Sequence, residues 1–290
     1  MSPRVGAILA LVLVMTIWGT TYIVTKVAVR EIPPLTLAAL RFFIMAVALL
    51  PFAAAAGGLK RLPKPFPMGT LVLMALVGFV LYYGAFNYAL AYGSAAQGAL
   101  IQALLPAAVA LGAIIGLKEK PSPRRMLGIA LAVGGVVLIV LTGEREATSP
   151  NPLLGGIYMF LSVVLWAVYT VLAKRLSAAD QTVVLAVVAT IGTVLQLPLV
   201  LVELDELPSP GEVSPQAWMS VAWLGLAASA FAILVYNRAL RVLDASLVGT
   251  YINLVPIVGL VSAVLFLGET LHGWQVVGAV LALAGMWLAA

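Results

Sequence analysis

The sequence predicts an all-α transmembrane protein of ten helices, arranged as two five-helix repeats of inverted topology. Three observations predict this fold: the composition, the length of the apolar stretches and an internal repeat. Of the 290 residues, 63% are hydrophobic and only 9% are charged, whereas a soluble domain carries about 25% charged residues. A bilayer core about 30 Å thick needs roughly 20 apolar helical residues per crossing, so the chain has room for ten crossings and no soluble domain.

The apolar stretches are separated by turn-forming prolines and glycines. Helices are expected because the stretches lack the alternating polar pattern of a membrane barrel strand. The first stretch is longer than a secretory signal core of roughly 7 to 15 apolar residues, so we interpret it as a retained helix. The expected spans are 5–27, 34–56, 67–90, 95–117, 125–142, 153–173, 182–202, 217–238, 245–267 and 272–290.

The positions of the basic residues predict the orientation of the spans. If the amino terminus is cytoplasmic, twelve of the sixteen Lys and Arg residues fall in cytoplasmic loops, and the acidic segment 203–212 is external. Cytoplasmic loops of membrane proteins are enriched in Lys and Arg. We therefore expect a multi-pass protein of the inner (plasma) membrane with both termini in the cytoplasm. The net charge of +5 comes from these loops and does not indicate a nucleic-acid partner.

An internal duplication emerges when the chain is shifted against itself by 150 residues. The shift aligns Asn87 with Asn237 and Pro106 with Pro256, and these residue types are scarce within spans. The predicted repeats are residues 1–147 and 148–290. Each has five spans, an odd number, so the second repeat must enter the membrane from the opposite side. Inverted repeats of this kind give alternating access to a central site in transporters.

The first span of each half carries a tryptophan near its middle, Trp18 in one and Trp166 in the other. At that depth an indole N–H has no lipid partner, so both side chains are expected to face protein or a cavity. Tyr22 follows Trp18 by four residues and Tyr169 follows Trp166 by three, which gives each helix an aromatic face. Core packing explains this pattern as well as a substrate cavity does.

Further aromatic and amide side chains on later spans are candidates for substrate binding. Asparagines within spans also join helices by hydrogen bonds, which is the alternative interpretation. The candidates are Tyr82, Tyr83, Phe86 and Asn87 on the third span, Gln102 on the fourth, Tyr236 and Asn237 on the eighth, and Tyr251 and Asn253 on the ninth.

Prolines and carboxylates also recur at equivalent positions of the two halves. Pro106 and Pro256 are expected to interrupt helical hydrogen bonding one turn earlier. Glu119 and Glu269 lie at helix ends, where each is expected to accept N–H bonds from the start of the next helix rather than to carry protons.

Arg41 lies about seven residues, or ~10 Å, into the second span, so it either extends to the surface or is buried and functional. Lys26 and Lys174 are expected at the membrane interface. Because no Asp or Glu occupies the middle of a span, facilitated diffusion is favoured over a proton relay.

These motifs resemble the EamA-type branch of the drug/metabolite transporter superfamily over nearly the whole chain. The resemblance rests on WGTTYIVTK from Trp18, WAVYTVLAK from Trp166 and RFF from Arg41, and on the proline of each fourth span with the glutamate that follows it. In the first half Lys118 replaces the glycine usual before that glutamate. Within the family the chain is most similar to the YddG exporters, which the resemblance links to amino acids, aromatic ones included, and to flat organic cations.

The predicted function is alternating-access export of small organic solutes, with amino acids as the first choice. A multidrug or organic-cation efflux protein, or another metabolite exporter of the same superfamily, is the alternative. An intramembrane enzyme would need a nucleophile and base or a metal cluster, but the chain has no Cys, one His and no paired carboxylates within spans. We expect a monomer in the lipid bilayer with no cofactor and no metal.

Overall fold

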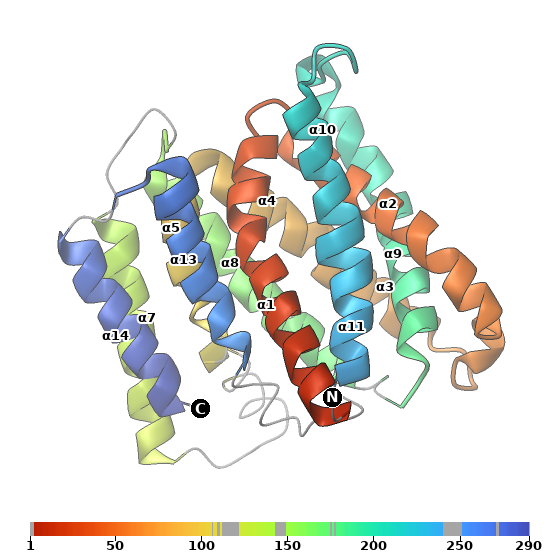
Figure 1. Ribbon diagram of the computed structural model, residues 1–290, viewed down its shortest axis with the longest axis horizontal. Helices are drawn as coiled ribbons and strands as arrows, with labels where there is room; N and C mark the ends of the chain where they lie inside the picture. Colours follow the sequence, from red (N-terminus) through yellow and green to blue (C-terminus); the bar gives the residue numbers. More distant parts are fainter. Residues whose placement is uncertain are drawn as a thin grey trace.

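The computed structural model describes residues 3–105, 107, 108, 111, 122–142, 149–174, 176, 178–239, 251–270 and 273–289. Every regular element among these residues is a helix (Figure 1). Six helical segments are long and apolar enough to cross a membrane, and three shorter apolar helices accompany them. The predicted all-helical membrane architecture is therefore confirmed, while the number of ten spans and their inverted arrangement stay predictions.

The helices begin and end close to the expected spans. The fourth span is described as far as α5 and a few residues beyond it, and Pro106, Glu119 and His272 lie outside the described residues. The elements are α1 (Pro3–Ala28), α2 (Pro34–Ala55), η1 (Gly58–Arg61), α3 (Met68–Ala75), η2 (Leu76–Leu81), α4 (Tyr82–Tyr92), α5 (Ala95–Gln102), α7 (Pro123–Leu141), α8 (Pro152–Lys174), α9 (Gln181–Val200), η3 (Leu201–Glu206), α10 (Pro215–Ala222), η4 (Trp223–Phe231), α11 (Ala232–Ala239), α13 (Leu254–Leu267) and α14 (Gly273–Ala289).

Several helices begin where the sequence supplies a cap. The Asp180 carboxylate accepts hydrogen bonds from the first backbone N–H groups of α9, and the Ser94 and Ser214 hydroxyls do the same for α5 and α10. Proline occupies the first turn of α2 and α10, where its missing N–H costs no hydrogen bond. Local sequence therefore fixes these starting points.

Two long helices change to π-helical winding in their middle. One runs through α3, η2 and α4, and the other through α10, η4 and α11, with η2 and η4 as the π-helical parts. A shift of 150 residues places η2 on residues 226–231, which lie within η4. A π-turn inserts a residue into the helical ladder and re-aims the side chains around it. The same irregularity thus occurs at equivalent positions of both halves.

Two other helices are interrupted at equivalent positions. A turn at residues 103–104 follows α5, and a turn at Asn253 precedes α13. Asn253 lies three residues before Pro256, whose ring cannot donate a helical hydrogen bond. The interruption expected before Pro256 is therefore observed.

Helices of the first half pack mainly against helices of the second half. Two pairs of equivalent helices contact each other directly, α2 with α9 and α7 with α14. The equivalent helices α1 and α8 each pack on helices of the opposite half: α1 packs on α10, η4, α11 and α13, and α8 packs on η2, α4 and α5. Figure 1 shows α7 and α14 side by side at one edge, and α2 and α9 at the other.

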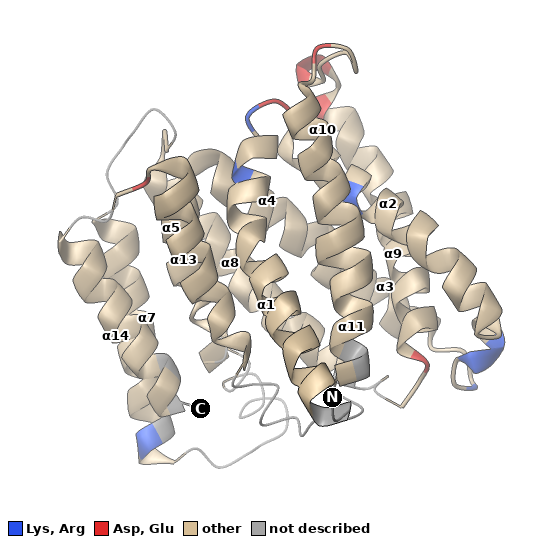
Figure 2. Ribbon diagram, in the orientation of Figure 1, with Lys and Arg blue, Asp and Glu red and all other residues tan. Residues whose placement is uncertain are grey.

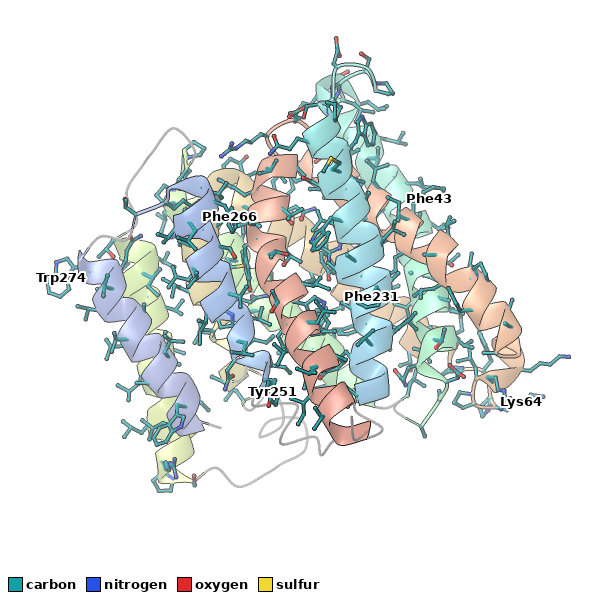
Figure 3. All side chains as sticks on the ribbon, in the orientation of Figure 1. Phe43, Lys64, Phe231, Tyr251, Phe266 and Trp274 are labelled. Carbon is teal, nitrogen blue, oxygen red and sulfur yellow. The ribbon has the colours of Figure 1, made fainter. Side chains whose placement is uncertain are left out.

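The outer surface of the helices is apolar. Phe43 and Trp274 are 53% and 65% exposed, and Phe266 is 74% exposed. In Figure 3 Trp274 projects outward from α14 at one edge of the molecule, and Phe43 lies on α2 toward the other edge. Large exposed apolar side chains are unfavourable in water but suit contact with lipid tails.

Charged residues gather at the two ends of the helices. Figure 2 shows the acidic segment 203–212 beside α10 at one end, and the basic residues of η1 and of the start of α7 toward the other end. At the acidic end the backbone N–H and the hydroxyl of Ser214 each donate a hydrogen bond of 2.7 Å to the Glu31 carboxylate. These bonds lower the pKa of this carboxyl below its usual range, and the backbone bond has the larger effect. Between the ends the surface is almost free of charge (Figure 2).

Helices α7 and α14 approach each other through small residues. A Cβ on Gly135 would lie 2.5 Å from the backbone nitrogen of Ala282 and the carbonyl oxygen of Gly278, which is too close for any side chain. Neighbouring Gly134 has no atom within 4 Å of the corresponding position. Membrane helices associate closely where such small residues meet.

We expect Gly135→Val to lower the melting temperature of the purified protein, because the added side chain forces α7 away from α14 at a cost of about 1–3 kcal/mol. Gly134→Val is the matched control and should melt like the wild type. Thermal unfolding in detergent, followed by intrinsic fluorescence, measures both. Equal melting of the two variants would contradict the close packing of these helices.

Candidate functional site

A cluster of aromatic rings lies in the main buried core. The Tyr82 ring centroid lies 4.7 Å from that of Trp166 and 4.5 Å from that of Tyr83. Phe42 stacks on Phe79 with 4.5 Å between centroids. We call the following eight residues the aromatic cluster: Tyr22 of α1, Phe42 of α2, Phe79 of η2, Tyr82, Tyr83 and Phe86 of α4, and Trp166 and Tyr169 of α8.

The π-helical segment η2 brings the two halves together at this cluster. A Cβ on Gly78 would overlap the ring of Tyr169, so glycine lets this ring of the second half lie against the backbone of η2. Tyr169 also lies 4.9 Å from Trp166 and 6.0 Å from Phe79. The cluster is therefore built across the boundary between the halves.

Six of the predicted site residues belong to this cluster, and a seventh is bonded to it. Gln102 Nε2 donates to the Tyr82 hydroxyl oxygen at 2.9 Å. Phe42 and Phe79 were not predicted, because a phenylalanine within a span has no sequence feature that separates a core residue from a lipid-facing one. Adjacent Phe43 illustrates this, since it is exposed while Phe42 is buried.

The structure places Trp18 in a different group of residues. Its ring lies 5.2 Å from that of Tyr236, and its indole N–H donates to the Ala228 carbonyl oxygen at 2.9 Å. Trp18, Tyr236 and Tyr251 all pack against a second apolar cluster that includes Leu11. The two equivalent tryptophans thus lie in separate clusters, and only Trp166 belongs to the aromatic cluster.

The predicted asparagines have less uniform positions. Asn87 Nδ2 donates to the Pro34 carbonyl oxygen at 2.8 Å, which ties α4 to the start of α2 and matches the helix-joining interpretation. Asn253 is half-buried at the turn before α13. Asn237 belongs to α11, but its side chain lies outside the described residues.

Arg41 is buried and does not extend to the surface. It is 3% exposed, its guanidinium carbon lies 4.2 Å from the centroid of the Tyr83 ring, and its Nε donates to Ser229 Oγ at 2.8 Å. Ser229 belongs to η4, so this bond joins the two halves. Arg41 was not among the candidate site residues predicted from the sequence. Its charge within an apolar span is the sequence feature that could have placed it there.

Three buried polar side chains around the aromatic cluster each have one atom without a hydrogen-bond partner. The atoms are Arg41 Nη1, Gln102 Oε1 and Gln196 Oε1. The opposite end of each side chain is engaged, as in Gln196, whose Nε2 donates to the Phe79 carbonyl oxygen at 3.1 Å. Gln196 was not predicted either. The cluster therefore combines aromatic surface with one free donor and two free acceptors.

Two buried carboxylates bind the backbone at helix starts. Glu203 accepts from the backbone N–H groups of Leu35 and Thr36 and from the Tyr88 hydroxyl. Glu269 accepts from the backbone N–H groups that begin α5, at 2.9 and 2.7 Å. The capping role expected for Glu269 is found, but the capped helix is α5 of the first half rather than the next helix, α14.

Lys26 lies at the end of α1, as expected, but it is buried. Its Nζ donates to the carbonyl oxygens of Leu90 and Gly93 at the end of α4. Lys26 and Glu269 thus hold the two sides of the short connection between α4 and α5. The side chain of Lys174 lies outside the described residues.

The aromatic cluster offers ring surface and unpaired polar atoms. The described residues contain no group of three or more His, Cys, Asp or Glu side chains placed to hold a metal ion. Aromatic faces and unpaired polar atoms bind a small solute by apolar contact and a few hydrogen bonds. Together with the lipid-facing helices, this arrangement defines the class: a multi-pass membrane protein with a buried aromatic cluster between its two halves.

The chain belongs to the EamA-like transporter family. The family profile matches residues 5–141 and again residues 153–290. The protein is therefore a membrane transporter and not an enzyme.

Similar proteins carry transporter names. An "Uncharacterized transporter" of Archaeoglobus fulgidus is 30% identical over 97% of this chain and 96% of its own length. Two further relatives are each named "Probable amino-acid metabolite efflux pump". The protein of Salmonella typhimurium is 28% identical over 95% of this chain and 92% of its own length. The protein of Escherichia coli is 27% identical over 98% of this chain and 94% of its own length. A solved structure described as "Crystal structure of protein" shares the fold, with a TM-score of 0.65 and 23% identity over 99% of this chain and 96% of that one.

We expect Glu203→Gln to lower the melting temperature, because the amide keeps one acceptor and turns a donor toward backbone N–H groups, a loss of about 1–3 kcal/mol. Glu206→Gln, an exposed neighbour in η3, is the control and should melt like the wild type. Thermal unfolding of the purified proteins tests this. If both variants melted alike, Glu203 would not stabilise the start of α2.

Proposed function

We propose that the protein exports small organic solutes, with amino acids, including aromatic ones, as its main substrates. The aromatic cluster is the observation that carries this proposal, because both halves contribute rings to it and unpaired polar atoms surround it. Such a mixture suits a solute with an apolar side chain and a small polar head. The names of the Salmonella and Escherichia relatives point to the same substrate class.

Transport by alternating access between inverted repeats 1–147 and 148–290 is part of the proposal. The π-helical segments and the turns at 103–104 and 253 occur at equivalent positions, and equivalent helices pair across the halves. Two similar bundles in opposite orientations open toward one membrane face and then the other. The two matches of the family profile support two units of this size.

Export of flat organic cations is the weaker alternative. Aromatic faces attract cations, and the cluster has many such faces. The Arg41 guanidinium, however, lies over Tyr83 within the cluster and repels a cationic solute. The amino-acid proposal therefore fits this site better.

The described residues favour a carrier without a proton relay along the spans. The buried carboxylates Glu203 and Glu269 lie at helix starts and are engaged with backbone N–H groups. A relay needs an ionisable group that faces the transport path. We propose facilitated diffusion of substrate through a monomer in the inner (plasma) membrane.

Counterflow in liposomes tests the function. Purified protein is reconstituted in vesicles loaded with unlabelled amino acid, and entry of radiolabelled phenylalanine, leucine or serine is followed. A carrier gives a transient accumulation of label above that in protein-free vesicles. Absence of accumulation for aromatic, aliphatic and polar amino acids alike would end the amino-acid proposal.

We expect Trp166→Ala to weaken the apparent affinity for phenylalanine by about tenfold, because it removes roughly 1.4 kcal/mol of aromatic contact at the cluster. Trp274→Ala is the matched control, since this tryptophan is 65% exposed on α14. Competition in the counterflow assay measures both variants after gel filtration has verified folding. Wild-type affinity in a folded Trp166→Ala protein would assign this residue to core packing.

The proposed orientation predicts from which side of the membrane single introduced cysteines can be labelled. The chain has no cysteine of its own, so a labelling signal comes only from the introduced one. We expect Asp205→Cys to react with an impermeant maleimide in intact cells, because the acidic segment is external. Lys60→Cys and Arg124→Cys should react only after permeabilisation. Labelling of Lys60→Cys and Asp205→Cys from the same side would contradict the topology.

A further inference from the structure

Arg41 carries a positive charge that no acidic side chain of the described residues neutralises. Its Nε bond goes to a neutral hydroxyl, Ser229 Oγ, and this hydroxyl in turn donates to the Leu224 carbonyl oxygen at 2.8 Å. The remaining contact is the face of the Tyr83 ring at 4.2 Å. No Asp or Glu of the described residues pairs with the guanidinium. Within a membrane span, an arginine without a counter-charge is costly and is typical of a functional site.

One nitrogen of the guanidinium has no hydrogen-bond partner. Arg41 Nη1 is buried and has no hydrogen-bond partner, although the residue is only 3% exposed. A buried charged donor without a partner loses its hydration and gains no bond in return. A carboxylate is the group that best repairs both deficits, because its charge and its two oxygens match the planar guanidinium fork.

We propose that Arg41 binds the carboxylate of the transported solute, an inference that rests on the proposed function. The substrate class is then a carboxylate attached to an apolar or aromatic group. The carboxylate pairs with Nη1, and the side chain of the solute contacts the rings next to Arg41, beginning with Tyr83 and continuing to Tyr82, whose centroid lies 4.5 Å from that of Tyr83.

The other unpaired atoms of the site complement a zwitterion. Gln102 Oε1 and Gln196 Oε1 are acceptors, and both side chains are bonded to members of the aromatic cluster, Tyr82 and Phe79. An acceptor suits the ammonium group of an amino acid, whereas a donor with a positive charge suits its carboxylate. One donor and two acceptors around apolar rings therefore favour an amino acid over a simple cation or a simple acid.

The position of Arg41 also links binding to transport. Arg41 belongs to α2 of the first half, and its bonding partner Ser229 belongs to η4 of the second half. Any movement of one half against the other changes the surroundings of the guanidinium. The affinity for a carboxylate bound there therefore changes with this movement, as the affinity of an alternating-access site for its solute does.

The test compares three ligands that differ only in their charged groups. Phenylalanine, phenethylamine, which lacks the carboxylate, and 3-phenylpropionate, which lacks the ammonium, compete with radiolabelled phenylalanine in wild-type proteoliposomes. We expect phenylalanine to compete about tenfold to a hundredfold more strongly than phenethylamine, as one charge-assisted hydrogen-bonded pair implies.

The variant Arg41→Gln should abolish this preference, because phenylalanine loses the partner of its carboxylate and the phenethylammonium cation is no longer repelled. Arg41→Lys, which keeps the charge but not the planar fork, should retain part of it. Arg61→Gln is the matched control, because Arg61 is an exposed residue of η1 whose Nε bonds only to the Ala56 carbonyl oxygen. The ratio of two competitors is measured on one preparation, so it does not depend on the fraction of folded protein.

Two outcomes overturn the proposal: equal competition by phenylalanine and phenethylamine in the wild type, or an unchanged ratio in Arg41→Gln. In either case Nη1 does not bind the carboxylate of the solute, and amino-acid transport by the wild type stands unaffected. If the wild type transports no amino acid, the proposed function fails. Thermal stabilisation by ligands then tests separately whether Arg41 binds a carboxylate. Stabilisation by 3-phenylpropionate but not by 3-phenylpropanol, lost in Arg41→Gln, would support carboxylate binding, and its absence would refute it.

Discussion

The structure depends on one constraint: a polar group surrounded by lipid and apolar side chains must find its partner within the protein. Helices satisfy their own backbone groups except at their ends and interruptions, and several buried charged side chains lie at these places. Glu203 and Glu269 bind the N–H groups that begin α2 and α5, and Lys26 binds the carbonyls that end α4. Each of these bonds also joins two helices, so satisfying the backbone fixes the packing.

The aromatic cluster departs from this rule in a systematic way. Of the four buried side-chain atoms without partners among the described residues, three belong to side chains around the cluster, on Arg41, Gln102 and Gln196, and the fourth is Thr25 Oγ1 on α1. Elsewhere Gln97, whose amide donates to the Pro152 carbonyl oxygen, is not among the side chains with an unpaired buried atom. A concentration of unsatisfied atoms at one place costs stability, and a solute that pairs with them recovers that cost.

The sequence predicted the helices well because span length and apolar content are local properties. It also singled out six members of the aromatic cluster, since mid-span tyrosines and tryptophans are unusual enough to be noticed. It failed where the deciding contact is distant in the chain. Phe42 and Phe43 are indistinguishable by sequence, and only the packing of α2 on α4 and α9 buries one and exposes the other. The guanidinium of Arg41 is held by Ser229, 188 residues away, so no local pattern indicates that it stays inside.

The irregular parts of the helices lie where the site lies. Phe79 belongs to the π-helical segment η2, Ser229 belongs to η4, and Gln102 ends α5 immediately before a turn. A regular α-helix is stiff, whereas a π-turn or an interrupted ladder leaves carbonyls that side chains must satisfy, as Gln196 does for Phe79 and Ser229 for Leu224. The candidate site residues and the side chains that hold the irregular backbone are thus the same or adjacent residues. Under the proposed function, occupancy of the cluster by a solute and the shape of the helices around it would therefore be coupled.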